Sequence, residues 1–263
     1  MKVKAFAKIN LGLRVLAKRK DGYHNIDTLF AEVELADELT IKVRKDGEIH
    51  VSGIDVPDQQ NSVFQAAWLL QKFAEKKLGA DIIIEKKIPI EAGLGGGSSD
   101  AAATLKVLNK LWKLKLAEKR LEHLAVKLGA DTPFFIRGGT QRGRGIGDRL
   151  SEYKLPKTIP REVVIIVPGI PVATKWAYEH IELPQKWVEF EPGDLTNDFE
   201  KLLFPQLPLL KKIKAALKRA GAAKAALSGS GSALYGLFKS KKAAKEAAEK
   251  LGKYGEIFVT KIK

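Results

Sequence analysis

The sequence predicts an α+β protein, because strand-like and helix-like segments alternate without the regular strand–helix–strand order of a doubly wound parallel sheet. The 263 residues are 45% hydrophobic and 29% charged, which suffices for a folded core. No internal repeat is visible. The pattern loosens after Leu150, where Pro156 and Pro160 bracket a domain boundary. We therefore expect two domains, residues 1–150 and 151–263.

The N-terminal half is expected to carry strands and helices in turn. Alternating or β-branched runs predict strands over residues 3–16, 29–35, 39–43, 48–51 and 81–85. Asp46-Gly47 predicts a hairpin turn into the fourth of these strands, and Gly138–Gly147 is expected to join two further strands. Asn61 is placed as the N-cap of one helix, and apolar residues at helical spacing predict two more over 101–112 and 117–128.

The C-terminal half shows the same mixture. Short apolar runs predict strands over residues 163–167, 223–227, 233–238 and 256–262. Helical spacing of apolar residues predicts helices over 175–181, 195–203, 209–220 and 243–251.

The composition excludes several classes of site. The chain has no cysteine, which excludes disulfides, thiolate zinc sites, iron–sulfur clusters and a cysteine nucleophile. Its four histidines are far apart and form no HExxH pattern, so no histidine metal site is expected. No apolar stretch approaches 18 residues and the first residues lack an apolar signal core, so we expect a cytoplasmic protein that does not bind membranes.

The charge is strongly positive: 46 Lys and Arg minus 31 Asp and Glu gives +15. Such an excess fits a nucleic-acid surface, attraction for a small polyanionic substrate, or a solvated lysine-rich surface. Lysines in Lys211–Lys214 and Lys241–Lys245 alternate with apolar residues at helical spacing, as on an exposed helix face. This spacing favours the solvated surface as the main cause.

The most unusual segment follows Pro89 and contains Gly93, Leu94, Gly95, Gly96, Gly97, Ser98 and Ser99 directly before a helix. Glycines let backbone N–H groups approach an anion, and a helix N-terminus adds unpaired N–H groups and a positive dipole. The two serines supply hydroxyls for phosphate or for a phosphate-bound Mg²⁺. The segment matches neither a Walker loop nor the Rossmann fingerprint, so we interpret it as a nucleotide-binding loop of another family rather than a flexible turn.

Two charged residues are candidates for chemistry. Lys8 lies within an otherwise apolar strand, and Asn10 shares its strand face, so the pair could present a cation and an amide to one ligand. An ordinary surface lysine is the alternative. Asp131 precedes Thr132-Pro133, where it either caps a helix or accepts a proton from a hydroxyl substrate.

Two loops are candidates for ligand binding. The run Ser228–Ser232 between two apolar strands is either a second anion-binding nest or a hairpin loop. Tyr23-His24 could stack on a nucleobase and hydrogen-bond its edge, or could merely pack within its loop.

Together these segments resemble the GHMP kinase superfamily, which consists of small-molecule kinases with three motifs. Ala7–Leu11 resembles the first motif, Pro89–Ala101 the second and Leu227–Gly231 the third. Residues 21–24, 129–135 and 197–200 narrow the resemblance to kinases of a cytidine-linked substrate. The resemblance implies an N-terminal ribosomal-protein-S5-like domain that binds ATP and a C-terminal ferredoxin-like α/β domain, with the active site between them.

The resemblance also implies the reaction, in which ATP with Mg²⁺ phosphorylates the 2-hydroxyl of a cytidine-diphosphate-linked methylerythritol. Asp131 would deprotonate that hydroxyl, and Lys8 would keep Asp131 ionised and neutralise the transferring phosphoryl group. The residues implied to bind ATP are Asn61, Ser62, Val63, Pro89, Gly93, Leu94, Gly95, Gly96, Gly97, Ser98 and Ser99, with Ser99 as a weak Mg²⁺ contact. Those implied to bind the second substrate are Asn10, Tyr23, His24, Thr174, Tyr178, Gly229 and Ser230. Either Lys86 or Lys87 could approach the adenine.

Two rival functions remain. A related kinase of homoserine or mevalonate would share the three motifs, but would not need Tyr23-His24 to recognise a base. An RNA-binding protein would fit the charge and the S5-like half, but it would need aromatic residues interleaved with the basic ones. The sequence therefore favours small-molecule partners over nucleic acid, in a monomer or homodimer.

Overall fold

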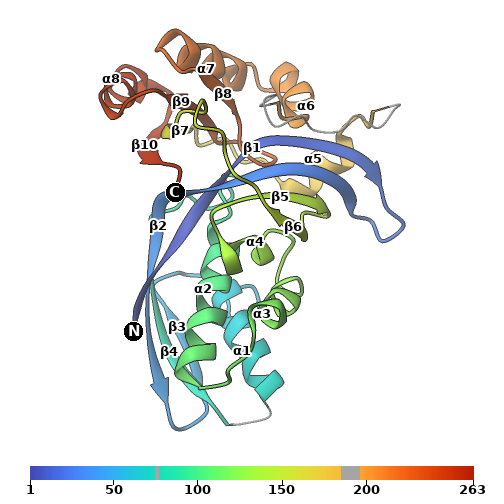
Figure 1. Ribbon diagram of the computed structural model, residues 1–263, viewed down its shortest axis with the longest axis vertical. Coiled ribbons are helices and arrows are strands. Elements are labelled where there is room, and N and C mark those ends of the chain that lie inside the picture. The colour runs from blue at the N-terminus through green and yellow to red at the C-terminus, as the bar shows by residue number, and fades with distance from the viewer. Residues whose placement is uncertain (75–76, 185–195) are drawn as a thin grey trace. The chain divides into compact units, whose positions relative to one another are not determined.

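The computed structural model describes residues 1–74, 77–184 and 196–263 (Figure 1). Their contacts divide the chain into two compact units. The first comprises residues 1–7, 36–90 and 95–138, and the second comprises residues 8–35, 91–94 and 139–263. Two long strands, β1 (Lys2–Lys18) and β2 (His24–Arg44), pair with each other and contribute to both units. The expected division at residue 150 stays a prediction.

The first unit is a sheet with helices on one face (Figure 1). Its strand order is β3 (Ile49–Ser52), β4 (Gly79–Glu85) and β2, and its helices are α1 (Ser62–Ala74), α2 (Gly96–Leu111), α3 (Glu118–Ala125) and α4 (Thr132–Arg137). In β4, Ile82 and Ile84 are buried whereas Ile83 is 46% exposed. This alternation is that of a strand with one covered face. Leu70 of α1 and Leu105 of α2 are fully buried.

The sequence prediction for the start of this sheet was wrong in two respects. The two strands expected over 29–35 and 39–43 form one continuous strand, β2, because the polar residue between them, Asp37, is buried and paired rather than placed in a turn. The expected hairpin into 48–51 is also absent among the described strands. β3 instead pairs in parallel with β4, which lies between β3 and β2 and pairs antiparallel with β2.

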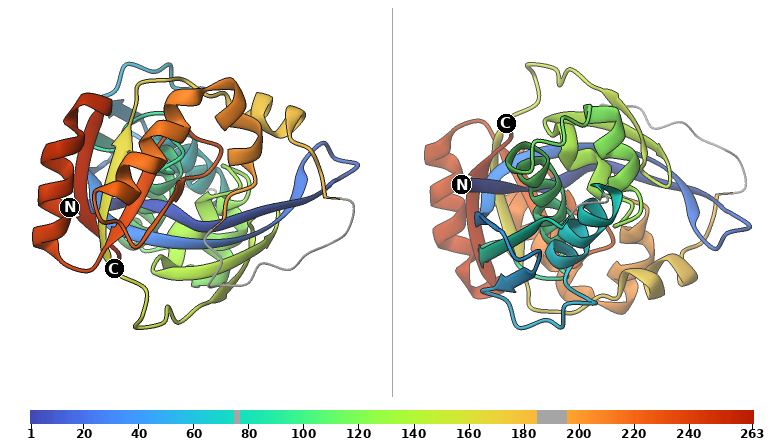
Figure 2. Two further views of the ribbon diagram at one scale, coloured as in Figure 1. Left: turned by 90° about the horizontal axis from the view of Figure 1, so that it is seen from above. Right: turned by 90° about the horizontal axis from the view of Figure 1, so that it is seen from below.

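The second unit contains a four-stranded antiparallel sheet in the order β10 (Glu256–Lys261), β7 (Glu162–Val167), β9 (Leu234–Phe238) and β8 (Lys224–Leu227). α7 (Pro208–Arg219) packs on β8 and β9, while α8 (Lys241–Leu251) packs on β7 and β10 (Figure 2). The remaining helices are α5 (Thr174–His180), α6 (Phe199–Gln206) and the short 3₁₀ helix η1 (Gly252–Tyr254). The strands of this sheet lie within two residues of their predicted bounds, which confirms those predictions.

In the second unit β5 (Thr140–Gly145) pairs antiparallel with β2, and β6 (Arg149–Glu152) pairs antiparallel with β5. The glycine-rich segment 138–147 was predicted to join two strands, but most of it is β5 itself. Gly143 has no side chain at the point where the ring of Phe30 packs, and a Cβ there would lie 2.7 Å from that ring. The glycine therefore serves close packing within a strand rather than a turn.

The other helices agree with their predicted positions, with three qualifications. α2, predicted over 101–112, begins at Gly96, so residues 96–99 of the glycine-rich segment belong to the helix. The helix predicted over 195–203 begins at Phe199, and its first predicted residue lies outside the described residues. α4 has no polar face, since Thr132 to Ile136 are all buried, and helical periodicity could not reveal it.

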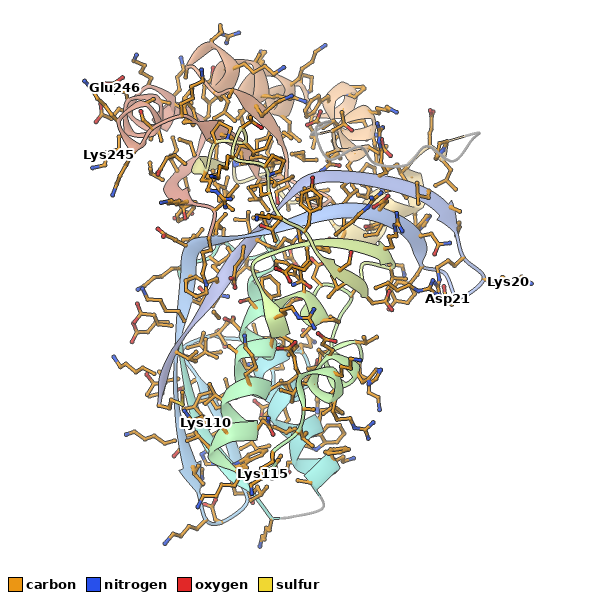
Figure 3. All side chains as sticks on the ribbon, viewed as in Figure 1. Lys20, Asp21, Lys110, Lys115, Lys245 and Glu246 are labelled. Carbon is orange, nitrogen blue, oxygen red and sulfur yellow. The ribbon has the colours of Figure 1, made fainter. Side chains whose placement is uncertain are left out.

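Lysines on the helices face solvent, as the charge pattern predicted. Lys110 at the end of α2 and Lys245 of α8 are exposed, and Lys245 projects outward from its helix (Figure 3). Among the described helices, none is both long and apolar enough to cross a lipid bilayer.

Candidate active site

The glycine-rich segment starts α2 in the first unit. Gly95 is the N-cap residue and has a left-handed backbone with φ of 71°, which glycine adopts without steric penalty. The first regular helical bond runs from the amide of Ser99 to the carbonyl of Gly95, at 2.9 Å. The amides of the preceding helix residues have no partner within the helix, so they can receive an anion at the positive end of the α2 dipole.

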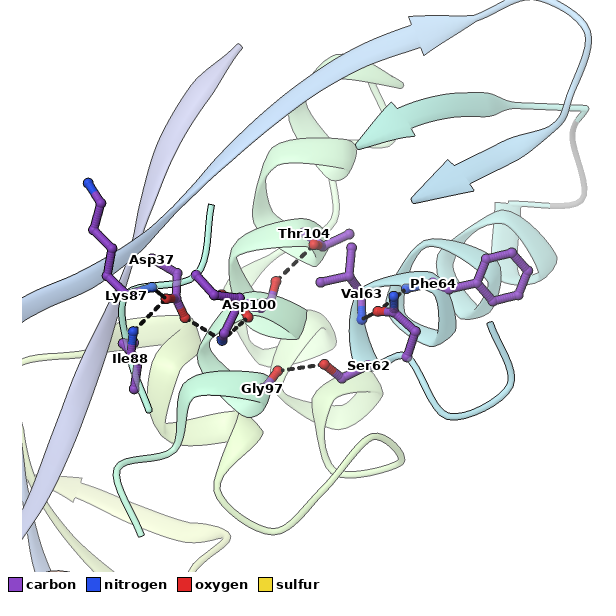
Figure 4. A network of polar contacts seen from close by, with 11 residues as sticks. Asp37, Ser62, Val63, Phe64, Lys87, Ile88, Gly97, Asp100 and Thr104 are labelled. Atoms are coloured by element: carbon purple, nitrogen blue, oxygen red, sulfur yellow. Dashed lines mark hydrogen bonds and ion pairs between the residues drawn. The ribbon is translucent and has the colours of Figure 1, made fainter. Parts of the chain in front are cut away.

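The segment 61–63 lies next to this loop, at the start of α1. Asn61 Oδ1 accepts the backbone N–H of Val63 at 3.0 Å, which confirms the predicted N-cap. Ser62 Oγ donates to the carbonyl of Gly97 at 2.9 Å (Figure 4). The fold thus brings together two groups of residues that the sequence analysis assigned to the same ligand.

An ionic cluster of Asp37, Lys86 and Asp100 lies next to this loop, and Figure 4 labels its two carboxylates. Lys86 Nζ lies 2.5 Å from Asp37 Oδ2 and 2.8 Å from Asp100 Oδ2. Burial raises the pKa of Asp100 to about 7. The nearby Lys86 ammonium lowers this pKa, but the neighbouring Asp37 carboxylate raises it and so opposes the effect of Lys86. Pro89, which precedes the loop, is half-buried in the same unit.

Asp131 and the start of α4 also belong to the first unit. Asp131 occupies the N-cap position, but its side chain makes no capping hydrogen bond to α4, every residue of which the structure describes. The alternative of a simple capping role is therefore weakened. α4 packs against α2, and a Cβ on Gly129 would lie 3.7 Å from Ser98 Oγ. Gly129, two residues before Asp131, thus lies close to Ser98 of the glycine-rich segment.

In the second unit, Lys8 is buried and not a surface lysine. Its Nζ donates to Asn10 Oδ1 at 2.6 Å and lies 5.6 Å from the centre of the Phe30 ring. The prediction that Lys8 and Asn10 share one strand face is confirmed. Asn10 Oδ1 also accepts the amide N–H of Gly229 at 3.0 Å, which joins the first motif to the third.

The same unit holds Gly93 and Leu94, the beginning of the glycine-rich segment. The amide of Lys8 donates to the carbonyl of Leu94, and Ser228 Oγ donates to the carbonyl of Gly93, both at 2.9 Å. A Cβ on Gly93 would lie 2.3 Å from the carbonyl oxygen of Ser228, so only glycine fits there. Parts of all three motifs therefore meet around Lys8.

The residues assigned to the second substrate form two groups in this unit. Thr174 Oγ1 lies 3.0 Å from Ser230 Oγ, which links the start of α5 to the third motif. One turn later on α5, the Tyr178 ring lies 5.3 Å from the His24 ring. Burial, with a smaller contribution from the charge of Lys18, lowers the pKa of His24, so its imidazole is neutral at pH 7.

Tyr23 lies beside His24 and is 57% exposed. It belongs to the turn between β1 and β2, whose tip residues Lys20 and Asp21 project into solvent (Figure 3). The amide of Tyr23 donates to Asp21 Oδ1 and its carbonyl accepts the amide of Arg19, so the backbone of this turn is held. The aromatic face remains accessible.

Several residues that organise these groups were not predicted from the sequence. Asn10 Nδ2 donates to Thr28 Oγ1 at 2.8 Å, and Thr28 donates to the carbonyl of Gly12. Asn197 Nδ2 donates to the carbonyls of Leu227 and Gly229 at 2.9 and 2.8 Å. The strand pattern of β2 indicated the position of Thr28, and the motif 197–200 contained Asn197. Neither signal identifies the residues with which these side chains form hydrogen bonds.

The pairing of Lys8 with Asp131 and the contact of Ser99 with Mg²⁺ both stay predictions. Lys8 and Asp131 belong to different units, and their pairing stays a prediction. Within residues 1–74, 77–184 and 196–263, no group of three or more Asp, Glu or His side chains is arranged to hold a metal. Mg²⁺ prefers a few protein oxygens together with substrate phosphates and water, which the hydroxyls of Ser98 and Ser99 fit.

Comparison with known proteins defines the class. The GHMP kinases N terminal domain family matches residues 61–139, and the GHMP kinases C terminal family matches residues 182–257. A crystal structure of homoserine kinase from Cytophaga hutchinsonii superposes with a TM-score of 0.72 over 99% of this chain and 95% of that one, at 20% identity, which shows the shared fold. The fold, the three motifs and both family matches make this chain a GHMP kinase.

More similar proteins narrow the class. The 4-diphosphocytidyl-2-C-methyl-D-erythritol kinase of Prosthecochloris aestuarii is 40% identical over 95% of this chain and 93% of its own length. A crystal structure of 4-(cytidine 5′-diphospho)-2C-methyl-D-erythritol kinase is 35% identical, covers 100% of this chain and 99% of that one, and has a TM-score of 0.89. The chain belongs to the family of 4-diphosphocytidyl-2-C-methyl-D-erythritol kinases.

Proposed function

We propose that this chain transfers the γ-phosphoryl group of ATP to the 2-hydroxyl of 4-diphosphocytidyl-2-C-methyl-D-erythritol. The products are the 2-phosphate and ADP, in the non-mevalonate route to isoprenoid precursors. The observation that carries the proposal is the joining of three motifs around Lys8, through Asn10 Oδ1 and the carbonyls of Gly93 and Leu94. Family membership at 40% identity over nearly the whole chain supports the choice of substrate.

The nucleotide is assigned to the start of α2. The unpaired amides of Gly96 and Gly97 would donate to phosphate oxygens, and Ser98 would add a hydroxyl. Residues 61–63 would lie near the adenine, as the family resemblance implies. Ser98 and Ser99 would offer hydroxyl oxygens to Mg²⁺, which when bound would supply charge neutralisation for the triphosphate.

The transfer itself needs a base and a charge stabiliser. Asp131 would accept the proton of the substrate 2-hydroxyl. At the same time the hydroxyl oxygen bonds to the γ-phosphorus, and the bond between the γ-phosphorus and the β–γ bridging oxygen breaks to release ADP. Lys8 would neutralise charge on the transferring group. Asn10, which holds Lys8 Nζ at 2.6 Å, would fix the direction of that ammonium and contact the substrate.

The cytosine base is assigned to Tyr23, His24 and Tyr178. Tyr23 offers an exposed ring for stacking, and the neutral imidazole of His24 can both donate and accept at the base edge. Thr174, Gly229 and Ser230 would face the diphosphate. Since both substrates are water-soluble nucleotides, we place the reaction in the cytoplasm. We also propose that the protein acts as a monomer or a homodimer.

A substrate panel tests the proposal against its rivals. ATP consumption is measured with 4-diphosphocytidyl-2-C-methyl-D-erythritol, homoserine and mevalonate, each over a range of concentrations. The proposal predicts turnover with the cytidine substrate only. Preferential turnover of homoserine or mevalonate would refute it, as would an absence of turnover combined with salt-dependent binding of generic RNA.

A further inference from the structure

Two adjacent lysines follow β4, and the structure gives them different environments. The Lys86 side chain is 17% exposed and its Nζ contacts the carboxylates of both Asp37 and Asp100. The Lys87 side chain is 51% exposed, and its Nζ pairs with Glu38 at 2.6 Å. One lysine is therefore built into the interior of the first unit, while its neighbour makes an ordinary surface pair, so we no longer assign Lys87 to the adenine.

The cluster links β2 and the end of β4 to α2, the helix that begins in the glycine-rich segment. Asp37 belongs to β2, Lys86 follows β4, and Asp100 is the fifth residue of α2. The Asp37 and Asp100 side chains are 0% and 3% exposed, so both carboxylates depend on protein partners. Lys86 supplies a shared partner for the two.

Asp37 also holds the main chain that enters the loop. Its Oδ1 accepts the backbone N–H of Lys87 at 2.6 Å and that of Ile88 at 2.8 Å (Figure 4). One carboxylate thus fixes both the ammonium of Lys86 and the direction of the chain immediately before Pro89. A carboxylate with several donors of this kind is a rigid anchor.

The cluster contacts the loop directly. A Cβ on Gly96, the first residue of α2, would lie 3.2 Å from Lys86 Nζ and 3.1 Å from Ile88 Cγ2. The ammonium therefore packs against the residue whose amide is assigned to the nucleotide phosphates. A shift of the ammonium would release the backbone at this point.

We propose that Lys86, held between Asp37 and Asp100, is a positioning residue that fixes the start of α2 for the phosphates of the nucleotide. The inference rests on the proposed function only in assigning the nucleotide to this loop. Without the ammonium, two buried carboxylates would repel each other and stand uncompensated behind an anion-binding loop. Nucleotide affinity falls for both reasons, while the groups that hold the second substrate keep their contacts.

The adjacent lysines provide a matched pair of variants. Lys86→Met and Lys87→Met are compared for ADP affinity by titration calorimetry without the second substrate, and for both Michaelis constants in the kinase assay. Lys86→Met should weaken ADP binding tenfold or more and raise the Michaelis constant for ATP, while that for the cytidine substrate changes less than twofold. Lys87→Met should stay within twofold of the parent. Equal ADP affinity in the two variants would overturn the proposal, as would an equal rise of both Michaelis constants in Lys86→Met.

A second pair decides the matter if Lys86→Met does not fold. Asp100 Oδ1 is buried without a hydrogen-bond partner among the described residues, whereas Oδ2 accepts from Lys86. Asp100→Asn can therefore keep an oxygen on Lys86 and place its amide nitrogen at the other position, while Asp100→Leu offers no acceptor. Asn should retain ADP affinity within threefold, and Leu should lose tenfold or more. Equal ADP affinities of Asp100→Asn and Asp100→Leu would contradict the positioning role of Lys86.

The calorimetric measurement separates this inference from the proposed function. If the parent protein phosphorylates the cytidine substrate and Lys86→Met binds ADP normally, only the positioning role is refuted. If the parent protein does not phosphorylate the cytidine substrate but Lys86→Met binds ADP more weakly than the parent, the assigned substrate is refuted and the positioning role is supported.

Discussion

Thr28 decides how the Asn10 amide is oriented. Asn10 Oδ1 accepts from Lys8 and Gly229 while its Nδ2 donates to Thr28, so the threonine oxygen fixes which end of the amide faces Lys8. Thr28→Val should lower kcat about 10- to 100-fold, the usual effect of a small misplacement of a catalytic group. Thr28→Ser should keep most of the turnover because it keeps the hydroxyl.

Thr260 provides the control for that substitution. It is a buried threonine of the same unit, and its Oγ1 accepts the amide of Leu35 at 2.9 Å, away from the three motifs. Steady-state kinetics of Thr260→Val should match the parent. If Thr28→Val turns over as fast as Thr260→Val, the threonine oxygen has no positioning role.

Asp131 carries the proposed proton transfer. Asp131→Asn should lower turnover about 10²- to 10⁴-fold, because an amide cannot accept the proton of the hydroxyl substrate. ADP affinity should change little, since α2 and residues 61–63 keep their contacts. Near-normal turnover of the purified variant would show that another group is the base.

Tyr23 tests the recognition of the cytosine. Tyr23→Ala should raise the Michaelis constant for the cytidine substrate tenfold or more, since stacking of a base contributes about 1–3 kcal/mol. The thermal midpoint should hardly change, because the side chain is 57% exposed. Tyr23→Phe keeps the ring and should bind normally; an unchanged constant in the alanine variant would mean that Tyr23 does not stack.

At the level of elements, the junction of β2, β4 and α2 makes stability depend on pH. Because burial raises the pKa of Asp100 from 3.8 to about 7, the folded state binds more protons than the unfolded state between these values. The free energy of unfolding should therefore fall as pH rises from about 4 to 7. Asp100→Asn removes this contribution, so urea unfolding at several pH values should show the variant gaining stability relative to the parent across that window. Parallel curves would contradict the shift.

Elements were predictable where a local pattern dictates them. The alternation of β1, the Asn61 cap of α1 and the short runs of β7 to β10 all identify their elements correctly. Two of the failures share one cause, which is a partner distant in sequence. Asp37 is tolerated inside β2 because of Lys86, and Gly143 belongs to a strand because Phe30 packs on it.

For the whole molecule, the sequence motifs located the site residues but not the network that joins them. Lys8, Asn10, Gly93 and Gly229 were assigned from short segments, while the bond between Asn10 and Gly229 spans 219 residues. Thr28, Asn197 and the Asp37–Lys86–Asp100 cluster act by supporting other residues. Their importance depends on tertiary contacts that no local spacing encodes.

The central claim concerns which hydroxyl the whole protein phosphorylates. The most direct measurement is ³¹P NMR of the product formed from ATP and 4-diphosphocytidyl-2-C-methyl-D-erythritol, with the phosphorus–proton couplings used to locate the new phosphate. The account predicts one new phosphomonoester on the 2-oxygen, formed in equal amount to ADP. A phosphate at another oxygen, or ADP formed without any phosphorylated cytidine product, would contradict it.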